Sequence, residues 1–161
     1  MLRITLLEFF FRGLPECFLI IFAVYAFSNT VINIKRYIIS STIFLIAVYL
    51  IRLLPIQYGV HTILNIIIII VLTVNINKIG IIKSIQASLM AMILEFICEG
   101  INVFIIQYIF KADIIYVLSE LILKTLYGIP SLLIFATIVS VYYFSVARRK
   151  KFREEIYGEN I

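Results

Sequence analysis

The hydrophobic positions of this chain form long runs that short polar segments separate. A run of about 20 apolar residues is the length of helix that crosses the hydrocarbon core of a bilayer. The pattern therefore predicts an all-α fold, a polytopic integral membrane helical bundle with about five transmembrane helices. The runs that we assign to these spans cover residues 14–28, 37–54, 59–74, 85–110 and 130–146.

The composition argues against a soluble domain. Hydrophobic residues make up 63% of the 161 residues, and the mean hydropathy is +1.12, whereas about 45–50% apolar residues are typical of soluble domains. Trp is absent, so the aromatic residues that anchor helices at the membrane interface must come from tyrosine. Many Ile, Asn and Lys residues without Trp indicate an AT-rich coding genome, and we expect a bacterial protein.

Pro15 divides the first apolar stretch, LLEFFFRGLPECFLIIFAVYAFS. Proline is tolerated in the first turn of a helix but breaks or kinks a helix interior. We therefore expect residues 3–12 to form a short interfacial or re-entrant helix, or the first part of one kinked helix from Ile4. A similar phrase, YGIPSLLIFATIVSVYYFS, occurs near the C-terminus. Either the likeness is chance, or Pro15 and Pro130 both begin broken helices whose ends line one outward-facing site.

Positive charge is concentrated directly behind the last span, in the segment ARRKKFR at residues 147–153 of a chain with net charge +5. A basic segment that follows a span is typical of a cytoplasmic anchor, and we do not expect nucleic-acid binding. The chain is therefore divided into a transmembrane domain, 1–146, and a short basic cytoplasmic tail, 147–161. The anchoring cluster consists of Arg148, Arg149, Lys150 and Lys151.

The other basic loops give the orientation of the spans. Counting back from a cytoplasmic tail through five spans places Lys35, Arg36, Lys78 and Lys83 on the cytoplasmic side. Residues 114–127 read as a helix of mixed polarity that is too short for a sixth span. The expected location is the cell membrane, with a multi-pass chain and a cytoplasmic C-terminus.

Two carboxylates interrupt the fourth span, in LMAMILEFICEGINVFII at residues 89–106. Glu95 and Glu99 are four residues apart and share a helix face. An ionised carboxylate in a span costs about 2.5–3.5 kcal/mol on the insertion scale, so we expect at least one to be protonated. The pair is either a packing seam or a site for a ligand, ion or proton. Its helix face carries Ser84, Ser88, Ala91, Glu95, Glu99 and Asn102.

A few other polar residues could take part in the same site. Arg52 lies one turn inside the outer end of the second span, and it either snorkels to the interface or pairs with Glu16 or Glu99. Glu16 could equally pair with Arg12, four residues before it. His61, the only histidine, is either an interfacial structural residue or an outward-facing pH or ligand contact. The candidate site residues are Glu16, Arg52, His61, Glu95, Glu99 and Asn102.

Catalysis has little support in the sequence. Cys17 and Cys98 lie in apolar helical segments without the spacing of a metal or redox motif, so we expect both to be small buried hydrophobic residues. The chain has no HExxH motif, no nucleophile elbow with a partner histidine and no phosphate-binding loop. We expect no enzymatic activity, no metal and no cofactor.

Three phrases carry a resemblance to a known family: AVYLIRLLPIQYGVHTIL, EFICEGINVF and LKTLYGIPSLLIF. In these and in its span pattern the chain resembles, over residues 1–146, the multi-span N-terminal sensor region of Gram-positive receptor histidine kinases related to peptide quorum receptors. In that family the last span leads into a kinase domain, and here it leads into the basic tail. The resemblance implies a sensor without its own kinase, which needs a partner protein.

Three functions remain open at this stage. The first is a membrane sensor, receptor-like or regulatory subunit that acts through a partner, either a separate kinase or another membrane subunit, or as a homo-oligomer. The second is a small substrate-binding subunit of a membrane transporter, similar in size to those of energy-coupling vitamin transporters. The third is an assembly subunit without a ligand. In each case the lipid bilayer is the first partner.

Overall fold

The structure, a computed structural model, describes residues 12–54, 58–109 and 121–158. Helices account for nearly all of these residues and no strand occurs among them, which confirms the all-α prediction. In chain order the elements are α2 (Leu14–Phe27), α3 (Ile34–Leu53), α4 (Tyr58–Asn75), α5 (Ile81–Phe104) with a short π-helix, η2 (Ile105–Ile109), and α7 (Leu121–Gly158).

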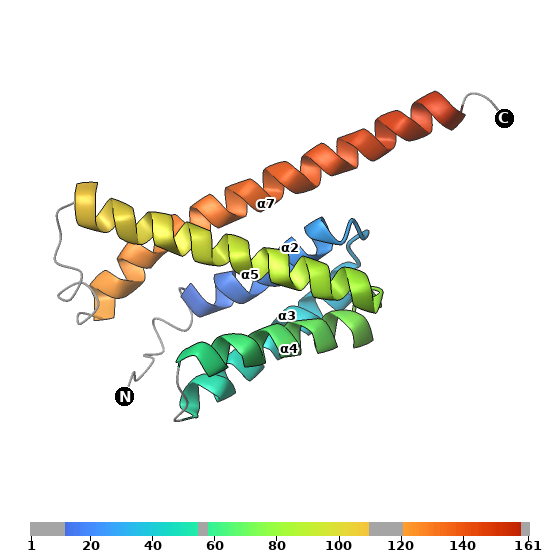
Figure 1. Cartoon of the computed structure of the whole chain (residues 1–161). Coiled ribbons are helices and arrows are strands. Elements are labelled where there is room, and N and C mark those ends of the chain that lie inside the picture. The colour runs from blue at the N-terminus through green and yellow to red at the C-terminus, as the bar shows by residue number, and fades with distance from the viewer. Residues whose placement is uncertain (1–11, 55–57, 110–120, 159–161) are drawn as a thin grey trace.

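Successive helices run in opposite directions, and the short helix α2 lies in the middle (Figure 1). It contacts α3, α5 and α7, and to a lesser extent α4. Its sequence is apolar on all sides, which is typical of a helix surrounded by protein. Ala23 and Ala26 are buried against its neighbours, because small side chains let helices approach closely.

Three helices are long and apolar enough to cross a membrane: Ile34–Leu53, Ile81–Tyr108 and Gly128–Val146. Leu14–Phe27 and Gly59–Asn75 are apolar but shorter. These helices make the chain compatible with a membrane protein, while the count of five spans stays a prediction.

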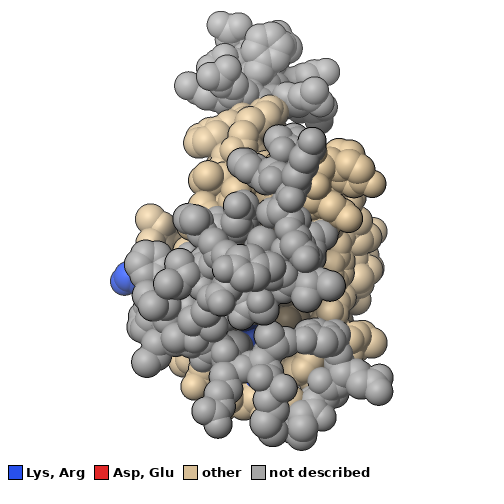
Figure 2. Space-filling view, turned by 90° about the vertical axis from the view of Figure 1, so that its left-hand side faces the viewer, with Lys and Arg blue, Asp and Glu red and all other residues tan. Residues whose placement is uncertain are grey.

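The distribution of polarity also fits a lipid environment. Ser40, Ser84 and Ser88 are fully buried, while Ile46 and Ile63 on the outside are more than half exposed. Seen from the end where α2 begins, the coloured surface is mostly neither basic nor acidic, with Lys and Arg in small patches and no acidic side chain in view (Figure 2).

The two prolines behave differently. Pro15 lies in the first turn of α2, as predicted, and Arg12 and Gly13 before it form a π-helical turn. The predicted break at Pro130 is wrong, because α7 runs through it from Leu121 to Gly158. A proline within a membrane helix is tolerated where packing and neighbouring groups make up for the lost backbone hydrogen bond. The carbonyl that loses its partner is that of Leu126, four residues before Pro130. Ser131 Oγ donates to a different carbonyl oxygen, that of Gly128, at 2.8 Å.

This result removes the idea of two broken helices, but the two similar phrases do pack against each other. α2 and α7 run in the same direction, side by side (Figure 1). The rings of Phe27 and Tyr142, each fourteen residues beyond its glycine of the Gly-x-Pro phrase, have centroids 5.1 Å apart. The phrases therefore lie in matching register, with their glycines at the same end of the bundle.

The remaining predictions about boundaries have mixed outcomes. The expected interfacial or re-entrant helix at residues 3–12 lies outside the described residues apart from Arg12. Of the expected mixed helix at 114–127, the described part, 121–127, belongs to α7 instead of forming a separate element. α7 also continues beyond residue 146, where we placed the domain boundary, as far as Gly158.

Candidate functional site

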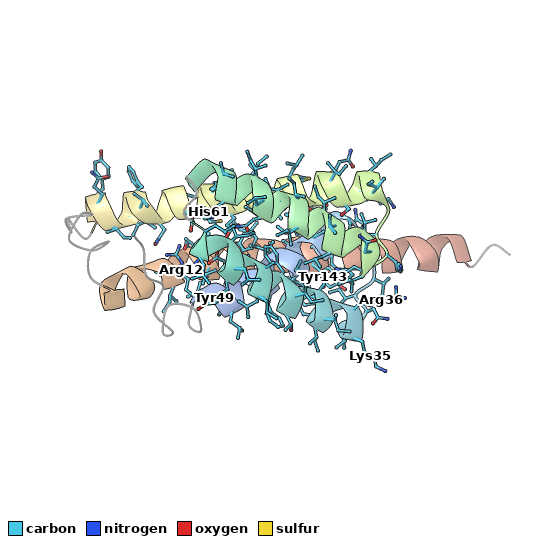
Figure 3. The ribbon with its side chains drawn as sticks, turned by 90° about the horizontal axis from the view of Figure 1, so that it is seen from below. Arg12, Lys35, Arg36, Tyr49, His61 and Tyr143 are labelled. Atoms are coloured by element: carbon cyan, nitrogen blue, oxygen red, sulfur yellow. The ribbon has the colours of Figure 1, made fainter. Side chains whose placement is uncertain are left out.

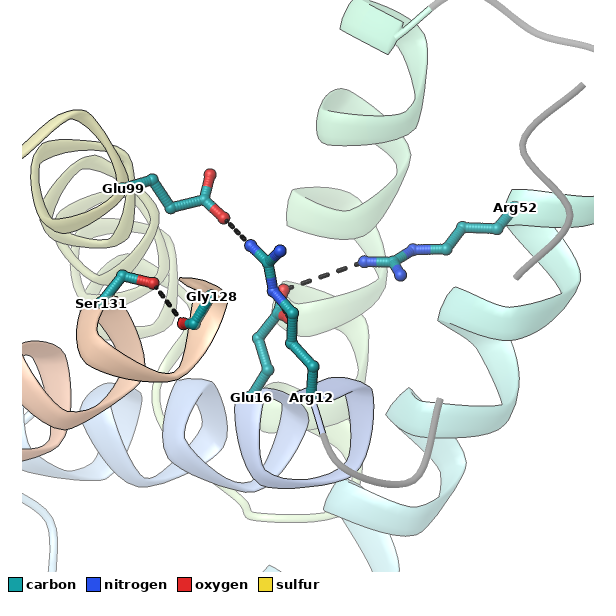
Figure 4. A network of polar contacts seen from close by, with 6 residues as sticks. All are labelled: Arg12, Glu16, Arg52, Glu99, Gly128 and Ser131. Atoms are coloured by element: carbon teal, nitrogen blue, oxygen red, sulfur yellow. Dashed lines mark hydrogen bonds and ion pairs between the residues drawn. The ribbon is translucent and has the colours of Figure 1, made fainter. Parts of the chain in front are cut away.

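Five charged residues lie close together at the end of the bundle where α2 begins and α3 ends. Figure 4 shows Arg12, Glu16, Arg52 and Glu99 of this cluster. The centre is Arg12, in the π-helical turn before α2. Its Nη2 atom donates to Glu99 Oε1 of α5 at 2.6 Å. This distance is typical of a short, charge-assisted hydrogen bond. The contact joins residues that are 87 positions apart in the chain, so it ties α2 to α5.

Glu16 links the other side of the cluster. One of its oxygens lies 3.9 Å from Arg12 Nε, and the other lies 3.9 Å from Arg52 Nη2 of α3. At these distances the groups attract as ions without a direct hydrogen bond. Glu16 is the best shielded of the three, with a side chain 16% exposed against 22% for Arg12 and 36% for Arg52.

Glu95 completes the cluster from α5, one turn before Glu99. Its side chain is hydrogen-bonded to that of Glu16. A hydrogen bond between two carboxyl groups needs one proton, because an ionised carboxylate only accepts. With that proton, Arg12 and Arg52 balance the remaining two negative charges. The cluster is thus electrically neutral when Glu16 and Glu95 share a proton.

The last side of the cluster is formed by α7, through a glycine. A Cβ atom built on Gly128 would lie 2.9 Å from Arg12 Nη1 and 3.0 Å from Arg12 Cζ. The first distance is shorter than real Cβ contacts, so a side chain at this position would have to displace the end of the Arg12 side chain. The cluster therefore contacts α7 as well as joining α2, α3 and α5.

The stripe predicted on α5 faces protein. Ser84, Ser88, Ala91 and Asn102 are buried, and Glu95 and Glu99 are partly buried. Asn102 takes part in a further interaction. Ser88 Oγ is buried without a hydrogen-bond partner among the described residues. The stripe is thus a helix–helix interface. The charged cluster lies on its part around Glu95 and Glu99, in the C-terminal half of α5.

Of the two partners that we considered for Arg52, the structure shows one. Arg52 contacts Glu16, one of the alternatives, and the contact to Glu99 comes from Arg12 instead. Sequence reasoning treated Arg12 only as a local partner of Glu16. Its place four residues before Glu16, at a predicted helix break, was the signal that a charge there could reach other helices.

His61 lies at the start of α4, at the same end of the bundle as Arg12 (Figure 3). It is partly buried and takes part in an interaction. His61 therefore lies at the same end of the bundle as the charged cluster.

Cys17 and Cys98 are both buried and reduced, as predicted for small apolar residues. The parts of the chain that the structure describes contain no group of three or more His, Cys, Asp or Glu side chains that could hold a metal ion. What the charged cluster can do chemically is exchange a proton, or exchange an internal ion pair for a polar ligand.

The chain matches no protein-family model, no curated protein and no solved structure.

Proposed function

We propose that the protein is an integral membrane sensor, receptor-like or regulatory subunit that acts through a partner protein. In this proposal the charged cluster around Glu95 and Glu99 is its proton or polar-ligand site. The observation that supports it best is the position of Arg12, which pairs with Glu99 and Glu16 and lies against Gly128. A change of charge in the cluster would act on α2, α5 and α7 together.

Because α7 is long, it can connect the charged cluster to a partner protein at its far end. Its 38 residues correspond to about 57 Å at 1.5 Å per residue, whereas the hydrocarbon core is about 30 Å thick. One end of this helix reaches the cluster, and the other carries the basic segment. In the proposed topology of five spans in the cell membrane, the C-terminal end lies in the cytoplasm and would contact a kinase or another membrane subunit.

The proton is the simplest signal for this site, because Glu16 and Glu95 are in contact and repel each other unless they share a proton. Loss of that proton leaves a net negative charge beside Arg12 and Arg52. The mutual repulsion of Glu16 and Glu95 would then favour separation of α2 from α5. The ionisable groups around Glu95 are Arg12, Glu16, Cys17, Arg52, Cys98 and Glu99, with His61 at the same end of the bundle.

The test measures the position of α7 directly. Spin labels are attached to Lys35→Cys at the start of α3 and Tyr157→Cys near the end of α7, with both native cysteines changed to alanine. Electron-resonance distances are recorded in lipid nanodiscs at pH 5 and pH 8. We expect the distances to change with pH in this chain and to lose their pH dependence in Glu95→Gln. We also expect Glu99→Gln to shift them at both pH values.

A packing role gives a different pattern. If the distances are the same at both pH values and in both glutamine variants, the cluster only joins helices. Glu99→Leu would then weaken assembly while Glu99→Gln is silent. For the alternative function, a substrate-binding transporter subunit, neighbouring genes discriminate: a pair of ATPases favours transport, and a kinase or response regulator favours the sensor.

A further inference from the structure

A second polar site lies at the opposite end of the bundle from the charged cluster. There, a groove of about 630 Å³ runs between the end of α2 and the beginning of α5. Asn29, Lys83 and Gln86 line its polar part, and Phe27, Leu89 and Met90 line its apolar part. No acidic residue is among the described residues that line it. The groove is therefore cationic at one end and apolar at the other.

The order of these residues along α5 gives the groove a direction. Lys83 is in the first turn of the helix, and Leu89 and Met90 lie about 10 Å further along at 1.5 Å per residue. In the proposed membrane topology, Lys83 is at the cytoplasmic surface and the two apolar residues are in the acyl-chain region. A phospholipid has the same order of parts, with a charged head group at the surface and hydrocarbon chains behind it.

The charge of the surrounding surface selects an anionic head group. Lys35 and Arg36 lie at this end of the bundle, at the start of α3 (Figure 3), and Lys78 lies in the turn before α5. The residue before α5 is Gly80, which has no side chain to cap the helix. The N–H groups of an uncapped first turn attract anions. Lys83 is exposed and can place its ammonium group at a phosphate.

We propose that this groove binds an anionic phospholipid of the cytoplasmic leaflet. Its phosphate lies at Lys83 and Asn29, and an acyl chain lies along Leu89 and Met90. The proposal depends on the membrane topology given above and not on the sensor role. If the groove does not bind such a lipid, the proposal for the charged cluster still stands, because the two sites share no residue.

The absence of Trp from the chain gives a direct measurement. Leu89→Trp places a single fluorophore at the apolar part of the groove, and Met90→Trp is the second choice if the first variant does not fold. The full chain is reconstituted with brominated phosphatidylglycerol or brominated phosphatidylcholine, which quench a neighbouring Trp. We expect a preference for phosphatidylglycerol of about fivefold, the effect of one basic residue near anionic lipid.

Three controls decide between the groove and a general surface effect. Ile67→Trp, on the exposed side of α4, should be quenched equally by both lipids. In the Leu89→Trp chain, Lys83→Gln should remove most of the preference, and Lys78→Gln, outside the groove, should remove clearly less of it. Equal quenching by the two lipids at Leu89→Trp would overturn the proposal. An equal loss of preference in Lys78→Gln and Lys83→Gln would overturn it too.

Discussion

The guanidinium group of Arg12 lies against Gly128, so close that a Cβ added at that position would have to displace it. The same group is 2.6 Å from Glu99 Oε1. Arg12 is therefore held between two helices, with its charge satisfied by α5 and its flat face covered by α7. Gly128 in turn is fixed by the hydrogen bond that Ser131 makes to its carbonyl oxygen.

Gly128→Ala tests this contact. The added methyl group must displace the end of the Arg12 side chain, which weakens its hydrogen bond to Glu99 and costs about 1–2 kcal/mol. We expect that loss in the free energy of unfolding, measured by denaturing the detergent-solubilised chain with sodium dodecyl sulphate. The matched control is Gly100→Ala in α5, where a Cβ would have no atom within 4 Å. Because alanine favours helix, this control should gain up to about 1 kcal/mol. Equal effects of the two substitutions would contradict the contact.

The pair of Arg12 and Glu99 should show coupling in a double-mutant cycle. We expect Arg12→Gln and Glu99→Gln together to cost less than the sum of the single substitutions. The coupling should be about 1–2 kcal/mol, at the low end for a charge-assisted hydrogen bond, because the Glu99 side chain is 41% exposed. The same unfolding measurement gives all four free energies. Strict additivity would show that the pair does not form in the folded chain.

The two arginines should differ in importance. Arg12 has two carboxylate partners among the described residues, whereas Arg52 has Glu16 at 3.9 Å and a side chain 36% exposed. We expect Arg12→Gln to lower the unfolding temperature clearly more than Arg52→Gln does. Thermal unfolding followed by circular dichroism in detergent makes the comparison. A larger effect of Arg52→Gln would place the centre of the cluster on α3.

Cysteine accessibility tests the membrane topology. Lys78 and Glu155 should lie on the cytoplasmic side, and Asp113, beyond the end of the fourth span at residue 110, on the outer side. In intact cells, a membrane-impermeant thiol reagent should label Asp113→Cys and leave Lys78→Cys and Glu155→Cys unlabelled until the cells are opened. The native cysteines are buried and should give a low background. Labelling of Glu155→Cys from outside would refute the topology.

The apolar runs were sufficient to predict the described helices. Each run of the sequence corresponds to one helix because a backbone in lipid must satisfy its own hydrogen bonds, and a helix does so locally. The run before Ser28 was predicted as a short span, and α2 is indeed the shortest α-helix among the described residues. That this helix is central could not be predicted, since its position depends on contacts with α3, α5 and α7.

Pro130 is a position where the local sequence predicts the wrong backbone structure. By itself the Gly-x-Pro phrase predicts a helix break, but the structure gives a continuous α7. The packing of α7 against α2 and α5 keeps the helix together without the backbone hydrogen bond that the proline removes. The partners of the charged residues could not be predicted from the sequence either, because Arg12 and Glu99 are brought together only by the packing of α2 on α5.

The central position of α2 has a consequence for biogenesis. This helix leaves the ribosome ahead of the other described helices, yet its Arg12 finds Glu99 only after 87 more residues have been synthesised. Until then, Arg12 and Glu16 lie at the end of an apolar helix, and Arg12 has no hydrogen bond to Glu99. The nascent bundle therefore needs an environment that tolerates those charges, such as the interior of the insertion machinery. In the proposed membrane topology, the arrival of α5 supplies Glu99 and allows the bundle to move into lipid.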